Sequence, residues 1–522
     1  MNCTCVRYTD LPHTSKLFAD FIYHPDRVQA FYPQIGASLD SIAHGMHFPA
    51  AQRAALVSAL RAQNGDSSAL DQLAREGTVA VVTGQQVGLF SGPAYTIYKA
   101  LTAVKLARDL SARGVPAVPV FWLATEDHDF AEVNHCWVFD AEHHPIKLEK
   151  PHSPAGNQPV GQFMLNAPPV AGLRAALSAF PFGDEISTLV EETYRPGQTM
   201  GQAFGGLLRH LLADYGLLHV DPMSPAMREL AAPALASALQ AAPEITAAVL
   251  ERNRALVAAG YHAQVHVEDQ TSFFFLLENG RRYTLRRIGR DYLQNGRRFS
   301  TEELLERAAD LSPNALLRPV VQDSMLPTVA YIGGPAELAY LAQSAVIYRA
   351  ILGRMPAALH RAGFTLLDQR SRKLMTRYGL TLPDCAHGDD AVRERIAARL
   401  IPPALSGELA RTQSQVEESV DRLIRDLAGF DASLAAAAGK SRQKITYQLG
   451  KLGRKIGRET MARDARVARD AEYLSGLVYP HRHLQERLYS ILPFLAKHGT
   501  GLIGEIYDCL NLACPDHQLA TV

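Results

Sequence analysis

Four polar residues, Glu126, Asp127, His128 and Asp129, directly follow the apolar run VPVFWLAT at residues 118–125. An imidazole with a pKa near neutrality can act as an acid or a base, so His128 is the predicted catalytic group, with Asp127 and Asp129 beside it. The same two aspartates could hold Mg²⁺, which prefers oxygen ligands. A structural interpretation also fits, because carboxylates favour the first turn of a helix and His128 could form only local hydrogen bonds.

A second candidate site lies in VVTGQQVGLFSGPAYTIYK, residues 81–99, where an apolar strand runs into a glycine-rich bend. The amides of Gln85 and Gln86 supply neutral donors and acceptors that can orient a substrate, and Lys99 could neutralise a phosphate or a carboxylate. The segment lacks the lysine of a phosphate-binding loop, and its glycines are four residues apart, unlike a dinucleotide fingerprint. Hydride transfer is therefore not predicted. Lys99 could equally be a solvated surface residue.

The glycine bend has an echo later in the chain. SGPA at residues 91–94 is followed by Tyr98, and GGPA at residues 333–336 is followed by Tyr340. In both, glycine permits the bend, proline starts a helix, and the free N–H groups of the first helical turn attract an anion. We expect both helix tips to point into one cleft that binds anionic small molecules. Any tight strand–helix connection could have this sequence without such a function.

A parallel sheet would bring these motifs together. Residues 78–140 alternate strand, helix and strand, the order of a parallel pair with a crossover helix. Residues 316–343 are predicted as two short strands, a glycine turn and a helix. Since ligands bind beyond the carboxyl ends of parallel strands, we expect Arg318, Gln322 and Asp323 to face the same crevice as the two earlier motifs.

The rest of the chain does not follow this alternation of strands and helices. Residues 141–310 are predicted as an insertion with a small antiparallel patch, because Asn279-Gly280 is a strong hairpin signal. Apolar residues alternate by four and three from Val416 to Leu434 and again from Ile445 to Ile456, which is the pattern of a coiled-coil seam. We expect an antiparallel helical hairpin that reverses near Gly439. Two ordinary amphipathic helices packed on the domain are the alternative.

Composition narrows the class of protein. A chain of 522 residues suggests about three domains, and 47% hydrophobic with 20% charged residues suits a soluble globular protein. Lys plus Arg and Asp plus Glu each number 53, so no net charge attracts nucleic acid or an anionic membrane. No apolar run is long enough to span a bilayer, and the N-terminus lacks the apolar core of a signal peptide.

The cysteines bear on the compartment. Six in so long a chain do not predict a disulfide framework, and they indicate a reducing, cytoplasmic location. Cys3 and Cys5, with one residue between them, are interpreted as part of a frayed terminus, with half of a metal site as the alternative. Cys509 and Cys514 make no more convincing a site.

The chain closely resembles the BshC family, the cysteine-adding enzymes of bacillithiol biosynthesis, and the resemblance is collinear over residues 6–510. It is carried by VVTGQQVGLFSGPAYTIYKALTAVKLA (81–107), PVFWLATEDHDFAEVNH (119–135), LLRPVVQDSMLPTVAYIGGPAELAY (316–340) and MPAALHRAGFTLLD (355–368). Two stretches depart from the family pattern. Ser91 stands where the family often has a second glycine, and Ala357, Ala358 and His360 lie in a segment that is usually richer in branched residues.

The resemblance implies an α/β fold: a Rossmann-like parallel-sheet core with inserted connecting-peptide regions, and a C-terminal α-helical coiled-coil domain that forms a homodimer. It implies four parts of the chain: an N-terminal helical segment packed on the core (1–77), the core interrupted within residues 141–310 (78–388), the antiparallel coiled-coil hairpin (389–480) and helices returning to the core (481–522).

The resemblance also implies an activity, in which a ligase joins the carboxyl group of cysteine to the amine of glucosaminyl malate and so forms bacillithiol. Because a carboxylate must be activated before an amine can displace its oxygen, ATP and Mg²⁺ are expected, with His128 as the base. The positions expected to bind substrate are Gly84, Gln85, Gln86, Gly92, Tyr95, Lys99, Glu126, Asn134, Arg318, Gln322, Asp323, Gly333, Gly334, Glu337 and Tyr340.

Two other functions stay open at this point. One is an ATP-dependent amide ligase or nucleotidyltransferase of the same architecture that acts on another substrate. The other is a non-catalytic dimeric protein that binds or senses thiol metabolites, since a fold alone proves no activity.

Overall fold

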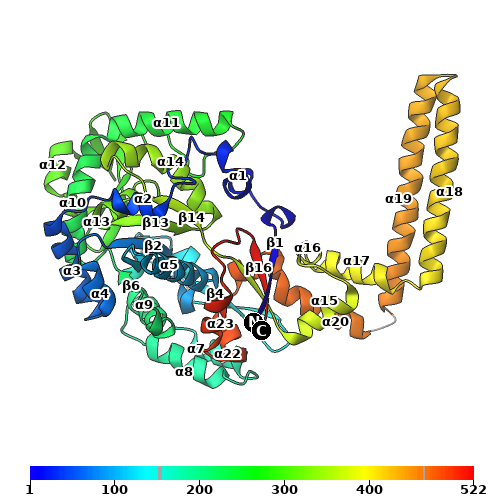
Figure 1. The fold of residues 1–522 in the computed structure, drawn as a ribbon, viewed down its shortest axis with the longest axis horizontal. Helices are drawn as coiled ribbons and strands as arrows, with labels where there is room; N and C mark the ends of the chain where they lie inside the picture. The colour runs from blue at the N-terminus through cyan, green and yellow to red at the C-terminus, as the bar shows by residue number, and fades with distance from the viewer. Residues whose placement is uncertain (151–155, 463–464) are drawn as a thin grey trace. The chain divides into compact units, whose positions relative to one another are not determined.

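The computed structural model describes residues 1–150, 156–462 and 465–522 (Figure 1). These residues form two compact units. The first contains Met1–Ala141, Pro145–Thr365 and Glu486–Ala520, and the second contains Glu142–His144, Leu366–Gln485 and Thr521–Val522. Residues 151–155 of the predicted insertion and residues 463–464 of the predicted coiled-coil segment lie outside the described residues.

The core of the first unit is a parallel sheet with the strand order β14-β13-β2-β3-β6. Its strands are β2 (Val79–Gln86), β3 (Ala117–Ala124), β6 (Leu218–Val220), β13 (Thr328–Gly333) and β14 (Ala357–His360). Val82 of β2 pairs with Val120 of β3 on one side and with Tyr331 of β13 on the other. The chain therefore adds strands first on one side of β2 and then on the other. The predicted Rossmann-like parallel core is confirmed.

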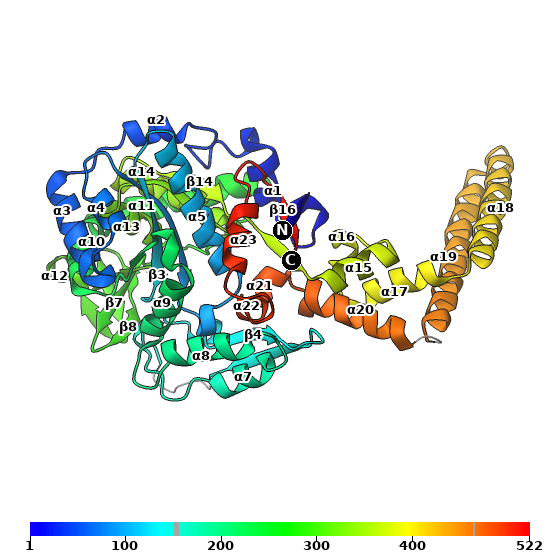
Figure 2. The ribbon, with the colours of Figure 1, turned by 60° about the horizontal axis from the view of Figure 1, so that its bottom comes forward.

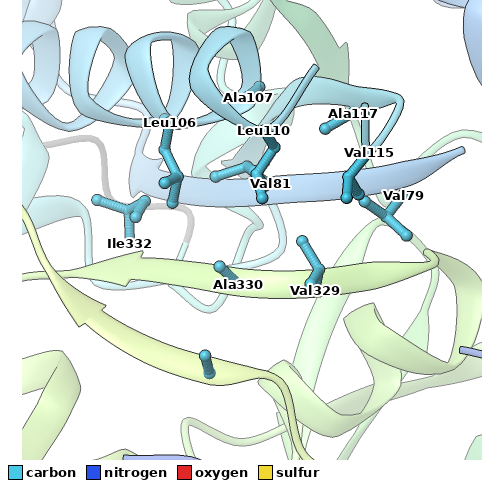
Figure 3. Packing of buried hydrophobic residues seen from close by; sticks show 12 residues of the cluster. Val79, Val81, Leu106, Ala107, Leu110, Val115, Ala117, Val329, Ala330 and Ile332 are labelled. Atoms are coloured by element: carbon cyan, nitrogen blue, oxygen red, sulfur yellow. The ribbon is translucent and has the colours of Figure 1, made fainter. Parts of the chain in front are cut away.

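Helix α5 (Tyr95–Ala112) covers one face of this sheet. Its residues Leu106, Ala107 and Leu110 pack against Val81 of β2 and Ile332 of β13 (Figure 3). The strands are almost wholly apolar, as expected for a sheet that is buried on both faces. Each fully buried side chain of leucine size contributes about 1.5–3 kcal/mol, so this cluster fixes the positions of the strand ends that follow it.

The predicted insertion contains small antiparallel sheets. Asn279 and Gly280, which both have positive φ, form the bend between strands β7 and β8 (Figure 2). The predicted hairpin is therefore confirmed. The strands of this part are β4 (His135–Phe139), β5 (Pro145–Glu149), β7 (Phe274–Glu278), β8 (Arg281–Thr284), β9 (Arg286–Ile288), β10 (Asp291–Gln294), β11 (Arg297–Phe299) and β12 (Leu311–Pro313). β12 and β8 flank β7 in one sheet, and β10 lies between β9 and β11 in another.

The first of the two strands predicted after residue 316 is wrong, because this segment is helix α13 (Arg318–Met325). The side chain of Asn314 accepts hydrogen bonds from the backbone N–H groups of Leu316 and Leu317, at 3.0 and 3.1 Å. Pro319 then occupies an early helical position, where its missing N–H costs nothing. Apolar content alone did not distinguish this short buried helix from a strand.

The remaining helices of the first unit and its C-terminal return surround the sheets. They are α1 (Lys16–Tyr23), α2 (Leu39–His44), α3 (Ala50–Asn64), α4 (Ser68–Leu73), α6 (Phe130–Val133), α7 (Val170–Leu177), α8 (Gly183–Thr193), α9 (Met200–Leu211), α10 (Pro225–Gln240), α11 (Ala242–Ala258), α12 (Thr301–Glu306), α14 (Pro335–Ile351), α21 (Gln485–Leu488), α22 (Leu492–His498) and α23 (Leu502–Cys509).

The N-terminus is ordered, contrary to the expectation of a frayed segment. Strand β1 (Asn2–Val6) lies beside β16 (His517–Thr521), which in turn lies beside β15 (Phe364–Leu367). Disulfides join Cys3 to Cys509 and Cys5 to Cys514. The prediction that the cysteines form no disulfides is therefore wrong, and the count no longer supports a reducing compartment. Spacing along the chain did not indicate partners that are about five hundred residues apart, because such connectivity cannot be deduced from sequence alone.

The second unit is helical. It contains α15 (Gln369–Tyr378), α16 (Leu382–Cys385), α17 (Asp389–Leu400), α18 (Pro403–Ala428), α19 (Ala432–Ala462) and α20 (Ala465–Val478). Helices α18 and α19 run side by side over their length (Figures 1 and 2). No helix in the described parts of the chain combines the length and the apolar composition needed to cross a membrane.

Two side-chain contacts show that α18 and α19 are antiparallel. Arg442 pairs with Asp421 at 3.1 Å and Thr446 donates to Glu417 at 3.3 Å, so the number rises on one helix as it falls on the other. The predicted coiled-coil hairpin is confirmed. Its reversal near Gly439 is wrong: the chain turns at residues 429–431, where Asp431 accepts from the N–H of Ser433 and starts α19. Gly439 lies inside that helix.

Candidate active site

A cavity of about 820 Å³ opens at the carboxyl end of the parallel sheet. It lies where strand addition changes sides, between β2 and β13, which is the usual ligand position in open α/β sheets. Strand ends, the first turn of α14 and the hairpin β7–β8 contribute its walls. The sequence-predicted residues that line it are Gly84, Gln85, Gln86, Tyr95, Glu126, Asp127, His128, Asp129, Arg318, Gly334, Glu337 and Tyr340.

The two glutamines at the end of β2 both line the cavity and have different partners. Gln85 donates to the hydroxyl of Tyr95 at 3.2 Å. The amide nitrogen of Gln86 lies 2.6 Å from carboxylate oxygens of both Asp127 and Glu132. Each glutamine is thus oriented by a fixed partner, as a substrate-positioning amide should be.

Lys99 and Glu337 form a buried ion pair beneath the cavity. Lys99 is 1% exposed, and its Nζ lies 2.7 Å from a carboxylate oxygen of Glu337 and 3.2 Å from the amide oxygen of Gln85. Burial lowers the pKa of Lys99. Burial would raise the pKa of Glu337, but Lys99 holds it below its usual value. The pair ties the end of β2 to α14, so Lys99 is no solvated surface lysine.

Asp127 is occupied by protein donors. One carboxylate oxygen accepts from the backbone N–H of His128 at 2.7 Å, and the other accepts from Gln86. Burial would raise the pKa of Asp127, but the Gln86 amide and the guanidinium of Arg282 lower it. Asp129 caps α6 by accepting from the N–H of Glu132.

This arrangement does not fit the predicted magnesium site. Both carboxylate oxygens of Asp127 and one of Asp129 already accept protein N–H groups, and Mg²⁺ demands near-octahedral oxygen ligands. Among the residues that the structure describes, no three or more histidine, cysteine or acidic side chains converge as metal ligands. We therefore derive no step through a metal at these residues.

Glu126 and His128 both face arginines. Glu126 is buried, pairs with Arg228 and accepts from Ser312 Oγ at 3.1 Å, so it supports the cavity wall. His128 Nδ1 lies 2.9 Å from Nη1 of Arg282, and burial together with Arg282 lowers the pKa of His128.

Arginines gather around the first turn of α14. Arg318 makes its hydrogen bonds to neutral groups: it donates to Gln322 at 2.9 Å and to the hydroxyls of Tyr340 and Tyr331 at 3.2 and 3.4 Å. Burial raises the pKa of both tyrosines, which keeps them uncharged. Arg318 lines the cavity, and the nearest carboxylate that acts on its charge is that of Glu337.

Two further arginines line the same wall. Arg361 forms a buried bidentate pair with Glu486, at 3.0 and 2.7 Å, and stacks over the ring of Tyr95. Arg487 follows Glu486 and is exposed in the cavity. The backbone N–H of Gly334 is already taken by the Glu337 carboxylate at 2.8 Å, so this helix tip offers that amide to no anion.

At the matching helix tip after Gly92, Tyr95 lines the cavity, but Gly92, Pro93 and Ala94 do not. The backbone N–H of Ala94, the N-cap residue of α5, donates to the carbonyl of Tyr489 at 2.7 Å. Ser91 is buried and contacts Ser490 and Tyr194. The expectation that both tips share one cleft is therefore wrong, because the protein's own C-terminal segment caps the first tip. The SGPA and GGPA strings are alike in backbone chemistry but not in surroundings.

The other predicted residues also lie outside this cavity. Asn134 is buried and donates to Glu149 and to the carbonyl of Lys150. Gln322 and Asp323 are buried in α13, where the Asp323 carboxylate accepts from Gln322, Thr328 and Tyr348. Gly333 pairs with His360 in the sheet. The strand predicted over α13 explains two of these misplacements, since a strand end would have faced the crevice.

Sequence reasoning missed several lining residues, above all Arg282, Arg361, Arg487 and Tyr331. Arg361 directly follows β14, so the strand-end argument could have included it. Arg282 lies two residues after the Asn279-Gly280 bend, but nothing local indicates that this hairpin reaches the sheet. Arg487 comes from the distant C-terminal segment and carries no local signal.

Comparison with known proteins agrees with this architecture. The family described as "Bacillithiol biosynthesis BshC, N-terminal Rossmann-like domain" matches residues 1–362, and "Bacillithiol biosynthesis BshC, C-terminal coiled-coil domain" matches residues 364–522. A protein of Solibacter usitatus named "Putative cysteine ligase BshC" is 61% identical over 100% of both chains. Proteins with the same name from Koribacter versatilis and Salinibacter ruber are 35% identical, over 99% of both chains, and 30% identical, over 97% of this chain and 96% of the relative.

Proposed function

Because this chain belongs to the BshC family, we propose that it is a cysteine ligase that joins the carboxyl group of cysteine to the amine of glucosaminyl malate, forming bacillithiol. The activation of the cysteine carboxyl group is proposed to depend on ATP. The reaction class is the formation of a carbon–nitrogen amide bond, in keeping with the ligase name of the relatives.

The observation that carries this proposal is that one cavity is lined by both arginines and carboxylates. We call Arg318, Arg361 and Arg487 the arginine wall, and Asp127, Asp129 and Glu132, which follow β3, the acidic wall. The charge of Arg361 is already paired with Glu486, which leaves Arg318 and Arg487 for a ligand. Glucosaminyl malate carries two carboxylates at its malate end and an amine on its sugar. The arginine wall suits the carboxylates, because guanidinium groups match carboxylate geometry, and the acidic wall suits the ammonium.

The chemistry assigns a task to each wall. The ammonium first gives a proton to a carboxylate of the acidic wall. The amine nitrogen then attacks the carbonyl carbon of activated cysteine, and a C–N bond forms as the C–O bond to the phosphoryl leaving group breaks. ATP would supply that leaving group, and the arginines that suit a carboxylate also suit a phosphate. Holding the amine against the acidic wall converts a bimolecular encounter into an oriented one, which lowers the barrier.

A reconstituted reaction tests the proposal. The protein, glucosaminyl malate, cysteine and ATP should together yield bacillithiol by mass spectrometry, and omitting ATP should abolish it. Arg318→Met should lower kcat/KM for glucosaminyl malate about tenfold to a hundredfold, as expected for the loss of a hydrogen bond to a charged group. Arg349→Met, an exposed position on α14, is the control. Absence of product with all three substrates would sink the ligase assignment.

We further propose that the coiled-coil hairpin pairs with a second copy of the chain. Val416, Val420 and Leu449 are half-buried between α18 and α19. Five other apolar residues of the two helices stay exposed by 40–51%: Leu405, Leu423, Leu434, Ile445 and Leu452. An apolar stripe of this kind is typical of an association surface, and the heptad pattern suits another helix as the occupant.

A further inference from the structure

Arg282 reaches the predicted catalytic histidine from the hairpin β7–β8. Its Nη1 lies 2.9 Å from Nδ1 of His128 and 3.8 Å from a carboxylate oxygen of Asp127. The pairing of β8 with β7 sets Arg282 opposite Leu277, which places the arginine in the cavity wall. A residue of the insertion thus contacts a residue that follows strand β3 of the parallel sheet.

The guanidinium is held by groups other than the histidine. Its Nε donates to Ser312 Oγ at 3.0 Å and its Nη2 donates to the carbonyl of Pro313 at 2.8 Å, both on β12. The guanidinium carbon also lies 3.8 Å from the centroid of the Phe275 ring. Arg282 is 7% exposed, so turning it away from His128 would leave buried donors without partners.

The direction of the hydrogen bond follows from the chemistry of arginine. A guanidinium has donors and no acceptor, and it stays protonated in proteins. Nδ1 of His128 must therefore be the acceptor, and the single proton of the neutral ring lies on Nε2. A base needs a free lone pair to receive a proton, and in this arrangement the lone pair of Nδ1 is already used.

We propose that His128 acts as a neutral hydrogen-bond donor through its Nε2–H group, and that Arg282 is the positioning residue that fixes this tautomer. The proposal rests on the ligase function proposed above. As the amine attacks, the carbonyl oxygen of the activated cysteine gains negative charge, and a preorganised N–H group stabilises such an oxygen. This role replaces that of the base, which the sequence alone had favoured.

The other charged groups near His128 do not reverse the assignment. Asp127 and Asp129 flank it in the chain and favour a charged ring. Burial and the Arg282 charge favour a neutral ring, and together they lower the pKa of His128. The ring also packs 5.4 Å from the Phe275 ring, centroid to centroid, which keeps water from part of its surface.

Nuclear magnetic resonance of the full chain with ¹⁵N-labelled histidine tests the tautomer directly. The chain has 19 histidines, so the His128 signals are identified by their loss in His128→Gln. At neutral pH the expected pattern is a protonated Nε2 and an unprotonated Nδ1. A proton on Nδ1, or a charged ring, would overturn the proposal. This measurement needs no substrate, so its result stands apart from the success or failure of the ligase assay.

Kinetics separate a donor from a base. The side-chain amide of His128→Gln can donate a hydrogen bond but cannot take a proton. It should therefore keep bacillithiol formation within about tenfold of the parent, whereas His128→Ala should lose about a hundredfold, the usual effect of removing one oxyanion donor. Equal loss in both variants, with both folded by circular dichroism, would contradict the donor role.

Arg282→Met tests the positioning role, because methionine keeps much of the contact with Phe275 and removes the donors. The expected result is a mixture of both His128 tautomers by the same resonance measurement, together with lower activity. Arg281→Met, at the exposed neighbouring position on β8, is the matched control and should change neither. An unchanged tautomer in a folded Arg282→Met protein would remove Arg282 from the proposal.

Discussion

Lys99 carries a charge beneath the cavity floor, a position that only a matched partner makes tolerable. Its ammonium group lies 2.7 Å from Glu337 and is 1% exposed. Removing one partner leaves a buried charge whose desolvation penalty is no longer offset. Removing both charges leaves no such penalty. The same carboxylate accepts from Tyr331 at 2.7 Å, so the pair also orders the arginine wall.

We predict that Lys99→Met lowers the free energy of unfolding by about 3–5 kcal/mol. The double variant Lys99→Met, Glu337→Gln should be more stable than Lys99→Met alone, because no unpaired charge remains. Urea unfolding followed by tryptophan fluorescence measures this, since both tryptophans, Trp122 and Trp137, belong to the first unit. Arg113→Met, on an exposed pair 3.0 Å from Asp40, should cost less than about 1 kcal/mol. If Lys99→Met and Arg113→Met lowered the free energy of unfolding by similar amounts, the argument would be contradicted.

Residue types and strand ends predicted part of the site. Gln85 and Gln86 end strand β2 and His128 lies shortly after β3, so the rule for parallel sheets placed them correctly in the cavity. Their partners were beyond that rule. Arg282 meets His128 through a contact 154 residues apart in the chain, and such a contact leaves no periodic trace in the sequence.

At the scale of elements, the end of the central strand depends on close contact between β2 and β3. Gly84 pairs with Trp122, and a side-chain Cβ at position 84 would lie 2.8 Å from the Trp122 carbonyl oxygen and 2.9 Å from its Cβ. Neither atom can move without shifting a strand. The glycine therefore allows the approach that places Gln85 and Gln86 in the cavity.

Gly84→Ala should destabilise the first unit by about 1–3 kcal/mol, the usual cost of overpacking a rigid interior. Gly206→Ala is the control, because its Cβ on α9 would meet only Thr193 at 3.9 Å. That change should be neutral or should stabilise by up to about 1 kcal/mol, since alanine favours helix. Denaturant midpoints of the two variants decide the matter, and an unshifted midpoint for Gly84→Ala would refute the close-contact argument.

Elements were predicted best where the pattern was long or the turn chemistry specific. The Asn279-Gly280 hairpin and α5 were found because the signals are local. The segment before Met325 was assigned to a strand because a short apolar run does not distinguish a buried helix from a strand. The start signal lay in the Asn314 side chain, which accepts from the N–H groups of Leu316 and Leu317 just before α13.

At the scale of the whole molecule, the proposed dimer can be tested by the mass of the particle in solution, in the parent protein and in variants of the coiled coil. The full chain should sediment as a dimer. Leu423→Glu with Leu452→Glu should shift it toward a monomer, because each buried leucine contributes about 1.5–3 kcal/mol to an apolar contact. Both positions are about half exposed in the single chain, so the hairpin itself should keep its helical content. Arg425→Glu, on the exposed face of α18, is the control. A monomeric parent protein would refute the dimer.

The fold class was predicted from strand rhythm, heptad spacing and family resemblance together, and all three agree with the structure. The prediction failed where distant segments meet. The disulfides from Cys3 and Cys5 and the capping of α5 by Tyr489 join parts of the chain separated by hundreds of residues. Local pattern carries no information on such meetings.

The contacts between α18 and α19 obey a simple arithmetic. The residue numbers of each contacting pair, 421 with 442 and 417 with 446, add up to the same total. Each residue of α18 therefore has a predictable partner on α19. Deleting seven residues from α18 together with their seven partners from α19 should keep the remaining pairs matched and shorten the hairpin by about 10 Å. Deleting different numbers of residues from the two helices would shift the register of every pair beyond the deletion.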